Sequence, residues 1–319
     1  MPTQSCTFNL DWRFALADDP GYADPDFDDS AWRELSLPHD WSVEFPFDQE
    51  QGEGCTGYLP GGVGWYRKAF TLEDDGNELC SVLFDGVYNN AEFFINGTSL
   101  GVHPYGYTPA LLDLTPHLRP AGTPNSLAVR VDHSRFADSR WYTGSGIYRD
   151  VSLIRKPLLH VPTWGTFVAT QDIPGDGARV TLETTICNAS ERERRFSVRT
   201  VFTDPDGREV AQGETQHVLG SGSDATGRVS VDVPDPRPWS PGEPNLYRAV
   251  TSIVEDGNLV DAHSTTFGIR SIRFDPDEGF FLNGEPTSIM GVCLHHDAGL
   301  VGAAVPNGVW RRRLLKLKE

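Results

Sequence analysis

The feature that most constrains this chain is an alternation of apolar and polar side chains with a period of two. In residues 126–132, Leu127, Val129 and Val131 fall on one face of an extended segment. Such spacing is typical of half-buried β-strands, because successive side chains of a strand point to opposite sides. Residues 1–157 show no long stretch of helical spacing, so the pattern predicts a β-sandwich over this range.

Local turn signals indicate the same architecture. Residues 91–95 have the pattern of a strand that ends at Asn96 and Gly97, which both tolerate the positive φ of a tight hairpin turn. Residues 158–268 repeat this style with fewer aromatic residues and with a turn signal at 204–207. A run of short strands over this length is typical of an immunoglobulin-like sandwich.

The pattern changes after Phe267. The nearly continuous apolar run 289–294 predicts a strand that is buried on both faces. A polar, glycine-rich loop follows, and Asn307 is then placed to cap a helix. The apolar residues at helical spacing in that helix are Trp310, Leu314 and Leu317. The order strand, loop, helix predicts the first βα unit of an α/β domain, and one such unit cannot close a core.

The charge balance restricts the class of partner. The chain has 45 acidic and 27 basic residues, which gives a net charge of −18. Such a surface repels phosphate backbones and anionic lipids, so we expect neither a nucleic-acid partner nor a membrane partner. A neutral substrate fits this charge most easily. No apolar run approaches the ~20 residues that a membrane helix needs.

Motifs that do not occur restrict compartment and cofactor. The five cysteines are widely spaced without a CxxC pair, so we expect neither a zinc site nor a dense disulfide framework. The first residues include Asp11 and Arg13 and lack a continuous apolar core, which argues against a secretory signal peptide. No glycine-rich phosphate-binding motif occurs. We therefore expect a cytoplasmic protein with no cofactor or metal site in this chain.

Two groups of residues allow either a structural or a functional interpretation. We interpret the carboxylates of 24–29 as solvated turn residues, with a calcium loop as the alternative. The glycine and the terminal glutamate of the helix-loop-helix calcium pattern are missing there. We interpret Trp12, Trp32, Trp41 and Trp65 as core residues, with a carbohydrate platform as the alternative.

Several motifs resemble those of glycoside hydrolase family 2, in the family's order along nearly the whole chain. They are Leu-Pro-His-Asp-Trp at 37–41, Gly-Trp-Tyr-Arg-Lys at 64–68, the stretch 140–151, Trp-Ser-Pro at 239–241 and Gly-Val-Cys-Leu-His-His-Asp at 291–297. The resemblance implies a mainly β chain with three parts. These are a galactose-binding-like jelly roll over 1–157, an immunoglobulin-like β-sandwich over 158–268 and the first βα unit of an incomplete TIM barrel over 269–319.

The resemblance also implies a chemistry. Family members include β-galactosidases, β-glucuronidases and β-mannosidases, which are retaining exo-glycosidases. Their two catalytic glutamates lie on later strands of the barrel, so we expect neither within these 319 residues. We therefore expect the N-terminal, non-catalytic part of such an enzyme, inactive by itself, with β-galactosidase as the favoured activity of the parent protein. A β-glucuronidase or β-mannosidase is the alternative, as is a stand-alone carbohydrate-binding or structural module.

The resemblance finally points to sugar-contacting residues. His295 occupies the family's position beside the first sugar, and His296 follows it; a hydrogen-bonded loop histidine is the alternative. In β-galactosidases a loop of the first domain also reaches the sugar, and a purely structural loop is the alternative. The candidates in that loop are Asp138, Arg140, Trp141 and Tyr142. The expected partner is a β-galactoside or related glycan. The parent protein is expected to be a homo-oligomer. Any divalent cation is expected in the part of the barrel outside this chain.

Overall fold

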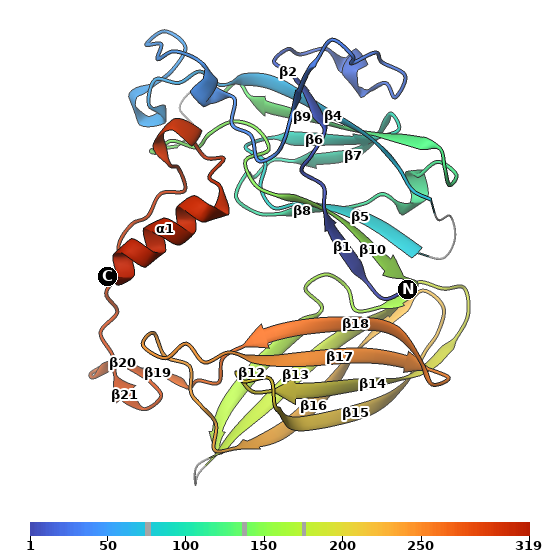
Figure 1. Ribbon diagram of the computed structural model, residues 1–319, viewed down its shortest axis with the longest axis vertical. Helices are drawn as coiled ribbons and strands as arrows, with labels where there is room; N and C mark the ends of the chain where they lie inside the picture. The colour runs from blue at the N-terminus through green and yellow to red at the C-terminus, as the bar shows by residue number, and fades with distance from the viewer. Residues whose placement is uncertain (74–77, 136–138, 174–176) are drawn as a thin grey trace. The chain divides into compact units, whose positions relative to one another are not determined.

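The computed structural model describes residues 1–73, 78–135, 139–173 and 177–319 (Figure 1). The chain forms two compact units. The first unit combines Ser5–Arg155 with Cys293–Glu319, and the second combines Met1–Gln4 with Lys156–Val292. Residues 269–319, which the sequence suggested as the start of a third domain, are thus divided between the two units.

The first unit is a β-sandwich. In its described residues, one sheet has the strand order β3-β2-β4-β9-β6-β7 and the other has the order β1-β10-β5-β8. The strands of the first sheet are β2 (Trp12–Ala15), β3 (Arg33–Leu35), β4 (Gly62–Thr71), β6 (Ala91–Ile95), β7 (Thr98–His103) and β9 (Pro124–His133). The strands of the second sheet are β1 (Gln4–Thr7), β5 (Glu78–Phe84), β8 (Ala110–Asp113) and β10 (Val151–Pro157). Short 3-10 turns η1 (Pro20–Ala23), η2 (Ser42–Glu44), η3 (Gly54–Thr56) and η4 (Thr115–His117) lie in the connections.

The alternation read from the sequence is confirmed in β9. Leu127, Val129 and Val131 are completely buried in the core of the sandwich. The hairpin between β6 and β7 is confirmed as well, because Asn96 and Gly97 take φ values of 50° and 83° between the paired residues Ile95 and Thr98. Local turn chemistry therefore sets this strand pairing.

Three of the four tryptophans are buried, as predicted. Trp12, Trp41 and Trp65 are at most 1% exposed. Trp32 is half-buried, and its ring packs edge-on against Tyr22 at 4.9 Å between centroids. Because their rings are buried, Trp12, Trp41 and Trp65 do not form the alternative carbohydrate platform.

The second unit is another sandwich, with the long strand β13 at the centre of one sheet. Over its described residues, β13 pairs with β11, β12 and β16, and the facing sheet has the order β15-β14-β17-β18. The strands of the first sheet are β11 (Leu159–His160), β12 (Thr166–Ile173), β13 (Gly177–Asn188) and β16 (Ser223–Pro234). Those of the facing sheet are β14 (Arg194–Thr203), β15 (Glu209–Leu219), β17 (Tyr247–Glu255) and β18 (Asn258–Phe267). The predicted turn at 204–207 connects β14 to β15, with Gly207 at φ 83°.

A small sheet of β19 (Ile272–Asp275), β20 (Gly279–Leu282) and β21 (Glu285–Pro286) follows. The strand predicted at 289–294 is wrong, because these residues have no regular structure. A strand needs a hydrogen-bonded neighbour, and none of the described strands pairs with this segment. Its apolar side chains remain at the surface, with Ile289 75% and Met290 92% exposed.

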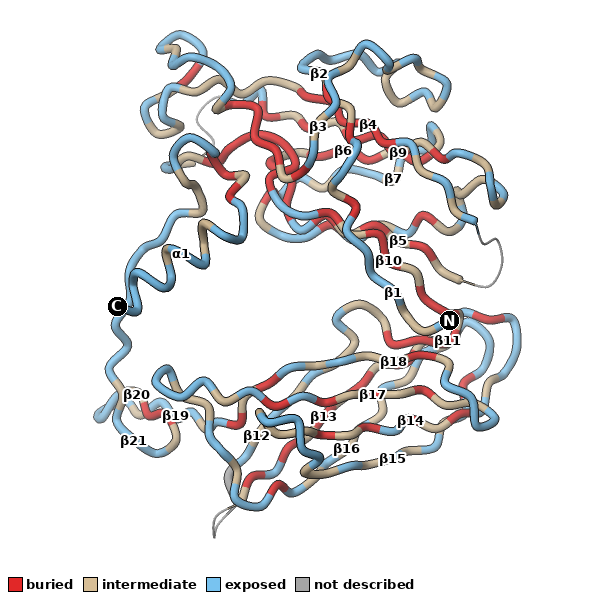
Figure 2. The backbone as a smooth tube through the Cα atoms, in the orientation of Figure 1, coloured by how far each residue is buried: buried red, intermediate tan, exposed pale blue. Residues whose placement is uncertain are grey.

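The chain ends in η5 (Gly299–Val301) and the helix α1 (Asn307–Lys318). The helix is confirmed, but the predicted cap is wrong by one residue, because Pro306 occupies the N-cap position and no side chain caps the helix. No residue of α1 is buried, and the apolar Leu314 and Leu317 are exposed (Figure 2). Among the described residues, no helix has both the length and the apolar character needed to cross a lipid bilayer.

Candidate functional site

Two segments of the first unit meet at an aromatic surface. Trp141, in the loop before β10, is 40% exposed, and its Nε1–H donates to the hydroxyl oxygen of Tyr107 at 2.9 Å. The ring of His295 lies edge-on to this indole, with 6.4 Å between centroids. His295 is itself exposed, so an indole face and an imidazole are both available to a ligand.

His295 also lines a hollow. This cavity of about 700 Å³ is lined by Leu294, Asp297 and Val309, together with the basic side chains of α1. The imidazole therefore contacts an exposed aromatic ring and also lines an open hollow, a suitable place for a side chain that hydrogen-bonds to a small polar ligand.

His296 lies deeper than His295. Its ring contacts Tyr107 and Tyr148 at centroid distances of 5.5 and 5.6 Å. Its Nε2 is 3.1 Å from the carbonyl oxygen of Thr143. A carbonyl only accepts hydrogen bonds, so Nε2 carries the proton and donates. His296 thus ties its own segment to the 139–145 loop.

Tyr142 points away from the exposed surface. Its hydroxyl donates to Oδ2 of Asp40 at 2.6 Å. Burial and then the charge of Asp40 hold the pKa of the Tyr142 phenol far above its ordinary value, so the phenol stays a proton donor. The hydroxyl of Tyr142 is therefore engaged inside the protein.

Asp40 is the residue that the sequence interpretation missed. Asp40 is only 2% exposed, and each of its two carboxylate oxygens accepts two hydrogen bonds. Oδ1 accepts from the backbone N–H of Ser42 at 3.1 Å and of Ser145 at 2.9 Å. Oδ2 accepts from Tyr142 and from the backbone N–H of Ala303 at 2.9 Å. The motif at 37–41 was the only sequence signal for this buried and fully partnered carboxylate.

Two glycines make this arrangement possible. Gly144 and Gly302 have φ values of 73° and 56°, in the region that favours glycine. A Cβ at either position would overlap Oδ2 of Asp40. The two segments therefore approach the carboxylate as closely as backbone allows.

The structure thus brings together some of the predicted residues. Trp141, His295 and His296 form one cluster, and Tyr142 joins it through Asp40. Arg140 is exposed. Asp138 lies outside the described residues.

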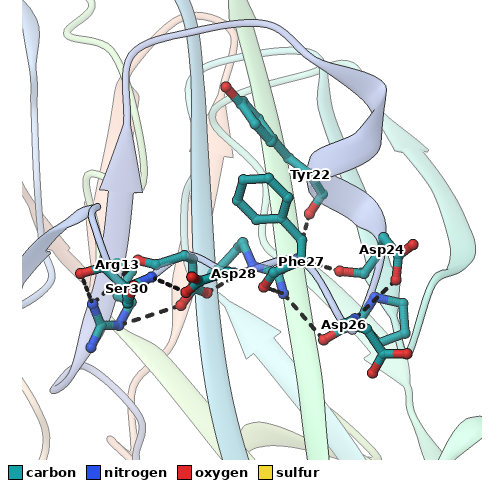
Figure 3. Close-up of polar contacts among 10 residues, drawn as sticks. Arg13, Tyr22, Asp24, Asp26, Phe27, Asp28 and Ser30 are labelled. Atoms are coloured by element: carbon teal, nitrogen blue, oxygen red, sulfur yellow. Dashed lines mark hydrogen bonds and ion pairs between the residues drawn. The ribbon is translucent and has the colours of Figure 1, made fainter.

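The aspartates of the loop 24–29 hydrogen-bond to the backbone of their own loop. Their carboxylates spread along the loop, and Asp24 and Asp28 accept from backbone N–H groups two residues ahead (Figure 3). The guanidinium of Arg67, 3% exposed, lies against the loop and donates to the carbonyl of Asp24 and to Asp29 at 2.8 Å. Among the described residues, no group of three or more His, Cys, Asp or Glu side chains could hold a metal ion.

Comparisons with known proteins agree with the two sandwiches. Residues 6–157 match the family model described as "Glycosyl hydrolases family 2, sugar binding domain". Residues 162–270 match the model described as "Glycosyl hydrolases family 2". The two models together account for most of the chain.

Individual relatives extend this similarity over the whole chain. It is 44% identical to the β-galactosidase BoGH2A of Bacteroides ovatus and 35% identical to a putative β-glucuronidase of Formosa agariphila. The alignments cover 100% and 98% of this chain but only 38% and 29% of those proteins. The chain thus spans about a third of the length of these curated relatives.

Solved structures have the same fold. A family 2 glycosyl hydrolase of Bacteroides cellulosilyticus superimposes with a TM-score of 0.93 at 35% identity, over 98% of this chain and 41% of that one. A β-glucuronidase of Bacteroides uniformis superimposes with a TM-score of 0.89 at 30% identity, over 99% of this chain and 38% of that one. With both sandwiches matched by the family's own models and the full chain matched by its members, the chain belongs to glycosyl hydrolases family 2.

Proposed function

We propose that this chain forms the N-terminal, non-catalytic part of a retaining exo-glycosidase that hydrolyses terminal β-glycosides, with β-galactosides as the preferred substrates. The observation that carries the proposal is the exposed Trp141 beside His295 in a family 2 chain. The more identical of the two relatives above is named a β-galactosidase, which supports the choice of sugar.

In this proposal the two side chains bind the sugar and do not break the bond. The indole of Trp141 packs against the apolar face of a pyranose, and the imidazole of His295 hydrogen-bonds to a ring hydroxyl. Hydrolysis with retention needs two carboxyl groups about 5–5.5 Å apart, one as nucleophile and one as acid/base. We place that pair in the part of the whole protein that corresponds to the remaining length of its relatives.

The test is hydrolysis of p-nitrophenyl glycosides by the whole protein and by the 319-residue chain. We expect the whole protein to cleave the β-galactoside faster than the β-glucuronide and the β-mannoside, with retention of configuration seen by NMR. We expect the 319-residue chain to release no p-nitrophenol. Hydrolysis by the short chain, or none by the whole protein, would refute the proposal.

The exposure of Trp141 favours one second function, a carbohydrate-binding module that acts alone. Calorimetric titration of the 319-residue chain with methyl β-galactoside distinguishes the two, with Trp141→Ala as control. Saturable binding that is lost in the variant, combined with an inactive whole protein, would favour the module. Activity of the whole protein favours the glycosidase.

A further inference from the structure

We propose that Asp40 is the positioning residue of the sugar-binding surface. Its buried carboxylate holds the 139–145 loop and the 296–303 segment together and so sets the position of Trp141 relative to His295. What the surface binds rests on the proposed function above, whereas the positioning itself rests on the contacts of the carboxylate.

The carboxylate connects to both segments directly. On the loop side it accepts from the Tyr142 hydroxyl, next to Trp141 in sequence, and from the N–H of Ser145. On the other side it accepts from the N–H of Ala303. One buried side chain thus hydrogen-bonds to both segments.

The second segment is held by two further hydrogen bonds on the way to His295. The N–H of Ala298 donates to the carbonyl of Gly302 at 2.9 Å and closes a turn. His296 is anchored to the carbonyl of Thr143 at 3.1 Å. His295 directly precedes His296, so in this proposal these bonds also position His295 relative to the loop.

All four groups that face Asp40 are hydrogen-bond donors. They are three backbone N–H groups and one phenol. A carboxylate accepts at both oxygens, whereas an asparagine of the same size turns an N–H₂ group toward donors at one of them. Charge-assisted bonds to a carboxylate are also stronger than those to an amide. The site thus requires a carboxylate specifically.

A positioning role predicts a particular kinetic change. Trp141 and His295 bind the sugar in the ground state and in the transition state alike, so a misplaced surface raises KM and changes kcat less. In the whole enzyme we expect Asp40→Asn to raise KM about tenfold, as for lost charge-assisted bonds, with kcat within about threefold.

Asp261→Asn is a matched control. Asp261 is 1% exposed and accepts from the backbone N–H groups of Thr3, Val161 and Ala262 in the second unit. This variant alters a comparably buried and partnered carboxylate that belongs to the other unit. It is expected to lower the melting temperature and to leave KM unchanged.

The direct readout is amide hydrogen exchange on the 319-residue chain, which needs no activity. We expect the N–H groups of Ser145 and Ala303 to exchange at least about tenfold faster in Asp40→Asn than in the parent chain. In Asp261→Asn they should exchange as in the parent chain. Unchanged exchange at both amides in folded Asp40→Asn would overturn the proposal, as would an equal rise in KM in the control.

Tyr142→Phe keeps the proposal testable if Asp40→Asn does not fold. It removes one bond and leaves the carboxylate in place, and we expect KM to rise about threefold. An unchanged KM in this variant would reject the positioning role. An inactive whole protein would reject the proposed function alone, because the exchange result decides the positioning claim by itself.

Discussion

The indole Nε1 of Trp141 lies 2.9 Å from the hydroxyl oxygen of Tyr107. This hydrogen bond orients the exposed ring of the proposed sugar surface, so the two residues should have graded effects on affinity. We expect Trp141→Ala to raise KM of the whole enzyme about 10- to 100-fold and Tyr107→Phe to raise it only about threefold, from steady-state kinetics. Equal KM values in Trp141→Ala and the parent enzyme would exclude Trp141 from the sugar site.

The two neighbouring histidines should separate binding from stability. His295 is exposed beside Trp141, so His295→Ala should weaken sugar binding and leave the melting temperature unchanged. His296 packs on two tyrosines and donates to Thr143, so His296→Ala should lower the free energy of unfolding by about 1–3 kcal/mol. Thermal denaturation and sugar titration of both variants check this. Lower stability in His295→Ala, with weaker sugar binding only in His296→Ala, would contradict the site geometry.

Stability should fall as the solution becomes acidic. Burial lowers the pKa of His160, and the ammonium of Lys156 lowers it further. An unfolded histidine takes up its proton near about pH 6.5, so below that pH the unfolded state binds a proton that the folded state does not. The stability from neutral His160 is therefore complete above about pH 6.5 and is lost as pH falls toward the folded pKa.

The measurement for this prediction is the melting temperature between pH 7.5 and 5.5. We expect it to decrease across this range, by roughly 2–4 °C for each kcal/mol lost. His160→Leu should show a smaller decrease because it removes one of the groups that titrates differently in the two states. An identical pH dependence in the variant would show that another group is responsible.

Arg67 should be essential for stability, and calcium should not be. The guanidinium is buried against the 24–29 loop and pairs with Asp29, so Arg67→Met leaves that carboxylate without its buried partner. We expect a loss of about 3–5 kcal/mol by urea denaturation, against less than about 1 kcal/mol for the more exposed Arg13→Met. Calcium chloride or EDTA should leave the melting temperature of the parent chain unchanged. A calcium-dependent rise would revive the calcium-loop alternative.

The exposed run 289–294 should promote aggregation of the 319-residue chain. Ile289 and Val292 are 75% and 74% exposed. Ile289→Lys with Val292→Lys should reduce light scattering on heating without lowering the melting temperature. Unchanged light scattering in the double variant would show that another segment causes the aggregation.

The sequence predicted best those elements of the fold that depend on the chemistry of neighbouring residues. The turn at Asn96 and Gly97 needs only backbone freedom at two residues, and it formed as expected. The strand at 289–294 was wrong because pairing depends on neighbours, and no described strand supplies one. Periodicity alone cannot report whether a partner strand is present.

The difference between local and long-range contacts also explains which residues of the site were predicted. The resemblance indicated Trp141 and His295, which lie together. Asp40 was missed because its partners Ser145 and Ala303 are 105 and 263 positions away, and only the fold brings their N–H groups to one carboxylate.

The most direct test of the central claim is the reading frame of the source gene beyond codon 319. The account predicts an open frame of several hundred codons that encodes the two glutamates of later barrel strands, the carboxylates that a retaining mechanism requires. A stop codon immediately after codon 319 would contradict it, because no catalytic pair would then accompany the sugar surface formed by Trp141 and His295.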